Sequence, residues 1–198
     1  ALPRLLHIVQ AEESVLTVGD WVLAESHAND ERWIVARLPP VTQIARRAND
    51  GRRQPLASNI DTALLVMGLD SDFNPRRMER YIAMVQASGV APVVVLTKAD
   101  IGMDVEEREL QLRHRLPATV PIVSVNALCE RACVAIAPWL TEGQTLVLLG
   151  SSGAGKSTLT NTLMRAPLQL TGGVRHGDGR GRHTTTSRSL HQCPGGAC

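Results

Sequence analysis

The chain has 198 residues, a mass of 21.4 kDa and a formal net charge of +2. Hydrophobic residues make up 43% and charged residues 20%, which is close to a soluble globular average, so a buried core is expected and disorder is not. The nearly balanced charge excludes a polyanion mimic and a strongly basic nucleic-acid coat, and the length allows one full domain or two small ones.

Neither a membrane-spanning segment nor a secretory signal peptide is expected from the sequence. No apolar run approaches the roughly 18 residues that a membrane helix needs, and the N-terminus lacks the pattern of a secretory signal. We therefore expect a cytoplasmic protein.

Four cysteines without a C-x-x-C pair favour free thiols; a zinc site from Cys193, Cys198 and His191 is the alternative.

The N-terminal part is typical of short β-strands. Two apolar, β-branched runs are separated by the turn signal Asn29-Asp30; they cover residues 15–24 and 32–36. Several strands so close together predict a small β-barrel or sandwich. The polar cluster 49–55 predicts a turn, so a barrel domain is expected over 1–54 and a second domain over 55–198.

The second domain alternates between strand and helix patterns. Strands are expected over 59–67, 91–96, 120–125 and 145–149. Helices are expected from Pro75 to just before Gly89, and over 105–116, 131–140 and 156–165. This alternation predicts an α/β fold with a mostly parallel sheet. The glycine-rich stretch 171–181 is expected to form a loop.

The strongest motif is a phosphate-binding loop. The segment 150–157 matches G-x-x-x-x-G-K-[ST], directly after an expected strand and at the start of an expected helix. Glycines let backbone N–H groups point at phosphate oxygens, and the helix N-terminus adds a positive dipole end. Lys156 would reach the β- and γ-phosphates, and the Ser157 hydroxyl would coordinate Mg²⁺. The expected phosphate-binding residues are Gly150, Ser151, Ser152, Gly153, Ala154, Gly155, Lys156, Ser157 and Thr158.

Two further segments favour guanine over adenine. Thr97-Lys-Ala-Asp100 resembles the N-K-x-D motif, in which a carboxylate accepts hydrogen bonds from guanine N1–H and N2–H₂; Lys98 would lie along the base with its aliphatic stem. The chain has two lysines, and both fall in expected nucleotide motifs. Asn126-Ala127 resembles the S-A-x motif, with Ser124 as an alternative register or a plain strand end as the alternative interpretation.

The order of these motifs indicates a circular permutation, because the guanine motifs precede the phosphate-binding loop. In this order the chain resembles the ribosome small subunit-dependent GTPase A family (RsgA/YjeQ). Val18-Gly-Asp-Trp-Val22 resembles the barrel signature of that family, and Gly179-Arg-Gly-Arg-His-Thr-Thr-Thr186 resembles its switch motif. The resemblance implies an OB-fold barrel, a circularly permuted P-loop GTPase domain and a C-terminal zinc-binding domain.

The resemblance also implies function. GTP or GDP would be the ligand and Mg²⁺ the cofactor, with Lys156 and Thr186 acting in catalysis and Ser157 and Thr186 holding the metal. Thr184 and Thr185 are alternatives to Thr186, and His183 is a candidate for positioning water. The partners would be the small ribosomal subunit and its rRNA, with no membrane, and the chain would be a monomer.

Positive charge gathers in two segments. Residues 37–53 carry five Arg and one Asp, and residues 171–198 carry four Arg and one Asp. Such patches suit RNA backbones, so rRNA contacts are expected at Arg46, Arg47, Arg180 and Arg182; a solvated basic surface is the alternative. Aromatic residues are 3% of the chain and the periodic ones are expected in the core, which disfavours base stacking.

Some family features are not found in the sequence. The D-x-P-G motif would follow Cys198, and the first barrel strands would precede Ala1. The zinc-binding domain would come after the D-x-P-G motif, so Zn²⁺ is not expected in residues 1–198. The sequence is therefore interpreted as part of a longer protein. Two other functions stay open: an ATP-dependent P-loop enzyme, and a non-hydrolysing RNA-binding module that holds a nucleotide.

Overall fold

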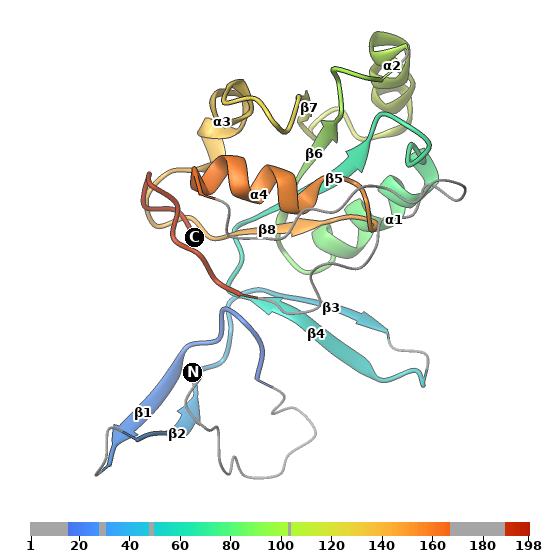
Figure 1. Ribbon diagram of the computed structural model, residues 1–198. Coiled ribbons are helices and arrows are strands. Elements are labelled where there is room, and N and C mark those ends of the chain that lie inside the picture. The colour runs from blue at the N-terminus through green and yellow to red at the C-terminus, as the bar shows by residue number, and fades with distance from the viewer. Residues whose placement is uncertain (1–15, 28–30, 48–49, 103, 167–188) are drawn as a thin grey trace.

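The computed structural model describes residues 16–27, 31–47, 50–102, 104–166 and 189–198, drawn in colour in Figure 1. The strands are β1 (Val22–Ser26), β2 (Arg32–Arg37), β3 (Gln43–Arg47), β4 (Arg53–Ser58), β5 (Thr62–Gly68), β6 (Ala91–Thr97), β7 (Ile122–Ser124) and β8 (Leu146–Leu149). The helices are α1 (Pro75–Gln86), α2 (Val105–Arg115), α3 (Arg131–Ile136) and α4 (Lys156–Met164), with a 3-10 turn η2 (Ala137–Trp139).

The centre of the fold is a four-stranded parallel sheet in the order β7-β6-β5-β8. Strand β5 is central, and Leu65 pairs with Val94 of β6 on one side and with Leu149 of β8 on the other. Every residue of β5 is buried, as expected for a strand that is covered on both faces. The expected alternation of strand and helix is therefore the one that the chain forms.

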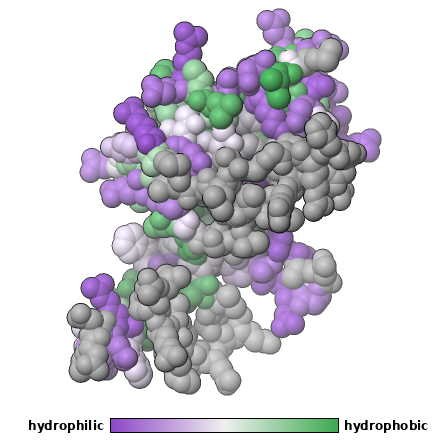
Figure 2. Space-filling view, in the orientation of Figure 1, coloured by the Kyte–Doolittle hydropathy of each residue, from purple (hydrophilic) through white to green (hydrophobic). Residues whose placement is uncertain are grey.

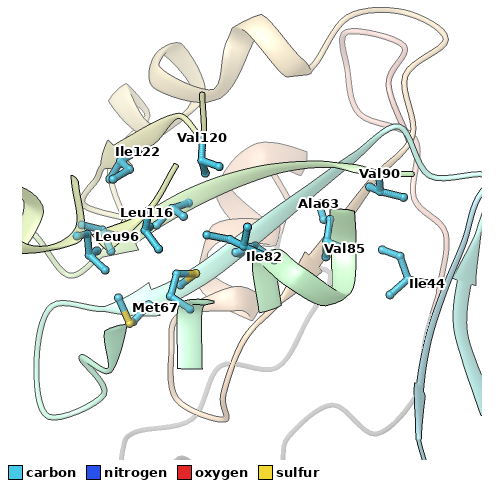
Figure 3. Close-up of a cluster of buried hydrophobic side chains, with 14 of the residues drawn as sticks. Ile44, Ala63, Met67, Ile82, Val85, Val90, Leu96, Leu116, Val120 and Ile122 are labelled. Carbon is cyan, nitrogen blue, oxygen red and sulfur yellow. The ribbon is translucent and has the colours of Figure 1, made fainter. Parts of the chain in front are cut away.

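Side chains of alternate residues in the central strands pack into two cores, one on each face of the sheet. Leu65 and Met67 pack with α1 and α2, whereas Leu64 and Val66 pack with α3 and α4. Figure 3 shows the first core, where Ile82 and other α1 side chains lie against β5 and β6. Both faces of the sheet are thus covered by packed helices.

Helix α1 shows how the local sequence sets these boundaries. The Asn74 side chain accepts a hydrogen bond from the N–H of Arg77 (3.0 Å), and Pro75 occupies the first turn. Helix α3 ends at Ile136, earlier than the expected 140, and a 3-10 turn with Pro138 near its start follows. No helix of the described residues is both long and apolar enough to cross a bilayer.

Two antiparallel hairpins, β1–β2 and β3–β4, lie beside the α/β part and form the OB-like region (Figure 1). The expected turn over 49–55 is wrong at its end, because residues from Arg53 onward pair with β3. Within this strand Pro55 lies opposite Ala45 of β3. The expected domain boundary between residues 54 and 55 falls within β4.

Two aromatic residues of the N-terminal part lie largely at the surface. Trp21 and Trp33 are 69% and 43% exposed, so they are not core residues of the described structure. The Asp20 carboxylate forms an ion pair with Arg37 (2.7 Å) and is almost fully buried. This ion pair connects the turn before β1 to the end of β2.

All four cysteines lie in the described residues and none forms a disulfide.

Candidate functional site

Four loops meet at one edge of the parallel sheet. They follow β5, β6, β7 and β8, and they begin at residues 69, 98, 125 and 150. Because the four strands are parallel, their carboxyl ends lie at the same edge, which is where open α/β sheets bind ligands. The structure therefore brings the three expected nucleotide motifs together.

The phosphate-binding loop leaves β8 under a tight steric constraint. A Cβ on Gly150 would lie 2.2 Å from the carbonyl oxygen of Val66, so no larger residue fits there without moving backbone. Gly153 and Gly155 have φ values of +80° and +92°, which glycine adopts without strain. Helix α4 starts at Lys156, so its first N–H groups face the loop and can bind an anion.

Lys156 lies folded over this loop. Its Nζ donates hydrogen bonds to the carbonyl oxygens of Gly150 (3.0 Å) and Ser151 (2.5 Å). Burial lowers the pKa of Lys156, the Asp72 carboxylate opposes this shift, and the Arg77 guanidinium adds to it. The ammonium is thus placed where it can exchange carbonyl partners for phosphate oxygens.

Thr97 connects the second motif to the phosphate-binding loop. It is fully buried, and its Oγ1 donates a hydrogen bond of 2.6 Å to the carbonyl of Ala154. A Cβ on Gly155 would lie 3.1 Å from the same Oγ1. Thr97 stands at the asparagine position of the N-K-x-D motif, and its short side chain contacts the phosphate-binding loop directly.

Lys98 and Asp100 lie on the turn that follows. Lys98 has a φ of +62°, a left-handed conformation that is unfavourable for a lysine, and its Nζ lies 2.6 Å from Oδ2 of Asp70. Asp100 is exposed, so its carboxylate is accessible to a base. The loop thus presents an aliphatic stem and a carboxylate at the ligand edge of the sheet.

The third motif is held by α4. The carbonyl of Ala127 accepts a hydrogen bond of 2.6 Å from Oγ1 of Thr162, and Ala127 itself is buried. The Asn126 side chain accepts from the N–H of Leu128 (2.9 Å), which closes a small turn. Ser124, the alternative register, donates instead to Glu109 of α2 (2.9 Å).

Sequence reasoning missed three residues that hold this edge together. Asp70 contacts Lys98, Asp72 contacts Ser151, and Thr162 contacts Ala127. The signal for the first two was an Asp-Ser-Asp segment directly after a strand of apolar residues. Thr162 carried no signal, because its partner is a backbone carbonyl 35 residues away.

Only part of the expected metal site is described. Ser157 lies in the first turn of α4 beside Lys156, a position where a hydroxyl can serve as a ligand of Mg²⁺. Thr186, with its alternatives Thr184 and Thr185, and the basic residues Arg180 and Arg182 lie outside the described residues, as does His183. Within the described ranges no group of three His, Cys, Asp or Glu side chains could hold a metal ion.

Arg46 and Arg47 lie apart from the nucleotide motifs. Both are exposed on β3, in the hairpin with β4, and Nε of Arg46 donates to Oε1 of Gln54 (2.9 Å). With Arg52 and Arg53 they give this hairpin a cluster of cationic side chains, and its free end is hydrophilic in Figure 2. The cluster could contact a phosphate backbone.

Comparison with known proteins identifies relatives at both the sequence and the structural level. The profile of a family described as "RsgA GTPase" matches residues 38–198. The chain is 51% identical over 183 residues to the small ribosomal subunit biogenesis GTPase RsgA of Xylella fastidiosa (strain M12), covering 91% of this chain and 54% of that protein. It is 50% identical to the protein of the same name from Xanthomonas oryzae pv. oryzae, covering 91% and 49%. The chain thus spans about half the length of these curated relatives.

Two solved structures share the fold. One is YjeQ from Thermotoga maritima, with a TM-score of 0.58 and 19% identity over 75% of this chain and 51% of that chain. The other is YloQ, described as a circularly permuted GTPase, with a TM-score of 0.55 and 18% identity over 77% of this chain and 51% of that chain. The expected fold class, a circularly permuted GTPase domain preceded by an OB-like region, is confirmed.

Proposed function

The chain belongs to the RsgA GTPase family, and we propose that it binds guanine nucleotides, hydrolyses GTP and acts in the maturation of the small ribosomal subunit. The observation that carries this proposal is the bond between Thr97 and Ala154. It joins the loop expected to bind the base directly to the loop expected to bind the phosphates. A contact within the protein that sets the spacing of two ligand-binding loops lowers the ordering cost of binding.

Each part of the site has a role that its chemistry supports. The N–H groups of the loop 150–155 and the ammonium of Lys156 would bind the phosphates, with Ser152, Gly153 and Thr158 completing that segment. Asp100 would accept the two guanine donors, and the backbone at Asn126 and Ala127 would face the other edge of the base. Ser157 and Thr186 would hold Mg²⁺, which supplies charge neutralisation when bound.

Lys156 is the residue through which binding would become catalysis. Its ammonium would leave the carbonyls of Gly150 and Ser151 for the phosphate oxygens, where it stabilises the negative charge that grows during phosphoryl transfer. Thr186 would complete the metal shell from the switch segment. Ordering of that segment around the γ-phosphate would favour binding to the subunit, and hydrolysis would release it.

The basic hairpin supports a role in RNA binding. Arg46 and Arg47 would contact rRNA from β3, and Arg180 and Arg182 would do so from the switch segment. Contacts of this kind read backbone shape and charge, and they weaken as salt rises. Within this proposal the protein acts as a monomer in the cytoplasm with Mg²⁺ as its cofactor, and Zn²⁺ is expected only in the C-terminal domain that the family resemblance implies.

Guanine binding is tested by calorimetry with GDP in the presence of Mg²⁺. We expect GDP to bind, ADP to compete poorly, and Asp100→Asn to weaken GDP binding because the amide cannot accept both guanine donors. Asp104→Asn is the matched control, because Asp104 is exposed four residues later and makes no capping hydrogen bond. Equal affinity for ADP and GDP would favour an ATP-dependent enzyme instead.

Turnover and subunit dependence need a second measurement. GTP hydrolysis is followed with and without purified small ribosomal subunits, and subunit binding is compared between GDP and a non-hydrolysable GTP analogue. Stimulated turnover and preference for the GTP state are expected. Equal subunit binding with GDP and with the GTP analogue, together with no GTP hydrolysis, would favour the non-hydrolysing RNA-binding module.

A further inference from the structure

The loop Asp70–Phe73, which we call the bracing loop, connects β5 to α1 and touches both nucleotide-binding loops. Oδ2 of Asp70 lies 2.6 Å from Nζ of Lys98 in the base-binding loop. Oδ1 of Asp72 accepts a hydrogen bond of 2.6 Å from Oγ of Ser151 in the phosphate-binding loop. Two carboxylates that are two residues apart thus reach the two halves of the site.

The two carboxylates are held by the loop itself. Oδ1 of Asp70 accepts from the N–H of Asp72 (3.1 Å), and Oδ2 of Asp72 accepts from the N–H of Gly68 (3.1 Å). A Cβ on Gly68 would lie 2.5 Å from Oδ1 of Asp70, so a larger residue at the end of β5 would displace this carboxylate. Backbone N–H groups of Gly68 and Asp72 thus help to hold both carboxylates in place.

Neighbouring helices hold the bracing loop from outside. Arg77 of α1 lies 2.7 Å from Oδ1 of Asp72, whose side chain is 9% exposed. Arg108 of α2 donates to the carbonyl of Asp70 (3.2 Å), and its guanidinium lies 5.1 Å from the centre of the Phe73 ring. The loop is therefore anchored to both helices of one sheet face.

The contact with Lys98 does more than join two surface charges. Exposed ion pairs contribute little to stability, but here the side chains of Lys98 and Asp70 are only 18% and 27% exposed. Lys98 also has a left-handed backbone, which other contacts must stabilise. Burial raises the pKa of Asp70, and the hydrogen bonds from Lys98 and the N–H of Asp72 outweigh it and lower that pKa below its usual range.

We propose that the bracing loop is a positioning element for nucleotide binding: Asp70 orients the Lys98 stem along the guanine, and Asp72 orients the phosphate-binding loop through Ser151. The inference rests on the proposed roles of Lys98 and Ser151 in binding the nucleotide. Neither aspartate touches the nucleotide; each acts through its partner.

A double-mutant cycle on GDP affinity tests the first contact. The full chain and its variants Asp70→Ala, Lys98→Ala and the double variant are titrated with a fluorescent methylanthraniloyl GDP in the presence of Mg²⁺. We expect Asp70→Ala to raise the Kd at least about fivefold, and the double variant to bind no more weakly than Lys98→Ala alone. If the fold increase in Kd of the double variant equals the product of the increases of the two single variants, the proposal is overturned.

The second contact has its own cycle, with Asp72→Ala, Ser151→Ala and their combination. The double variant is again expected to match the weaker single variant, and Ser151→Thr, which keeps a hydroxyl, is expected to retain most of the affinity. A Ser151→Ala variant with the affinity of the original chain would refute this half of the proposal.

Asp61→Ala is the matched control, because Asp61 lies just before the opposite end of β5 and accepts from the N–H of Thr145 (2.7 Å). It is expected to lower the melting temperature and to leave the Kd for GDP unchanged. If Asp70→Ala does not fold, Asp70→Asn replaces it. A chain that binds no GDP before any substitution would overturn the proposed function as well, whereas GDP binding that Asp70 and Asp72 do not affect would overturn the bracing role alone.

Discussion

Gly150 is the position where a single added methyl group should weaken both the fold and nucleotide binding. A Cβ there would lie 2.2 Å from the carbonyl oxygen of Val66, and relief to the 3.0 Å that real contacts tolerate requires a movement of about 0.8 Å between β5 and the loop. Both partners are backbone, so no side chain can turn away. Overpacking of this kind costs about 1–3 kcal/mol, and we expect Gly150→Ala to lie near the upper end.

The same movement displaces the N–H groups that would meet the phosphates. A hydrogen bond to a charged group contributes about 1.5–3 kcal/mol, so the loss of one corresponds to about 10- to 150-fold in Kd. Calorimetry with GDP and Mg²⁺ measures the affinity, and urea unfolding measures the free energy of unfolding.

The control is Gly143→Ala, at the other end of the same strand. Gly143 has a φ of +80°, and nothing lies within 4 Å of the position that a Cβ would take there. Backbone strain should cost this variant about 1–2 kcal/mol in stability, with no effect on the Kd. If Gly150→Ala binds GDP within about twofold of the original chain, the steric argument is refuted.

Three further substitutions test the core, the third motif and the hairpin contact. Leu65→Ala should lower the free energy of unfolding by about 2–5 kcal/mol in urea, because Leu65 is fully buried in the central strand; a loss below about 1 kcal/mol would contradict that packing. Thr162→Val should cost about 1–2 kcal/mol and weaken GDP binding, since the carbonyl of Ala127 loses its donor; unchanged values would show that the bond is dispensable. Burial raises the pKa of Asp20, but hydrogen bonds from Arg37 and the N–H of Thr17 lower it overall, so its stabilisation is present above about pH 4 and is lost as the pH falls through the native pKa. Asp20→Asn should therefore cost about 1–3 kcal/mol at pH 7, and the difference should shrink in urea titrations below pH 4.

Three short hydrogen bonds connect the loops of the candidate site. Thr97 to Ala154, Thr162 to Ala127 and Asp72 to Ser151 are three hydrogen bonds of 2.6 Å, each between residues at least 35 positions apart. Each bond joins the phosphate-binding loop or its helix to another loop at the same edge. A base-binding segment and a phosphate-binding segment are thereby held at a fixed spacing.

Much of the fold was readable from local patterns. The strand 62–68 and the helix 75–86 follow from a continuous apolar run and from an Asn-Pro start with apolar residues at helical spacing. The phosphate-binding loop was readable because its glycines meet a backbone requirement that no other residue meets. The family resemblance came from the order of the motifs, and it is confirmed.

The sequence was less informative for the hairpins. The strand that begins at Arg53 was missed, because its first residues are polar and include Pro55, and its pairing partner β3 decides its structure. Trp21 and Trp33 look like core residues by type, yet they are exposed on the hairpin β1–β2. Hydrophobic type predicts burial only where a partner surface covers the side chain.

The sequence by itself therefore determined the strands and helices of the α/β part, the phosphate-binding loop and the order of its motifs, because each depends on residues close together in the chain. Only the tertiary structure decided which side chains hold the loops together. The partners of Asp70, Asp72 and Thr162 lie 28, 79 and 35 residues away in the chain, so no local pattern identifies these contacts. Such contacts depend on where the parallel strands place their carboxyl ends, and no local pattern encodes that arrangement.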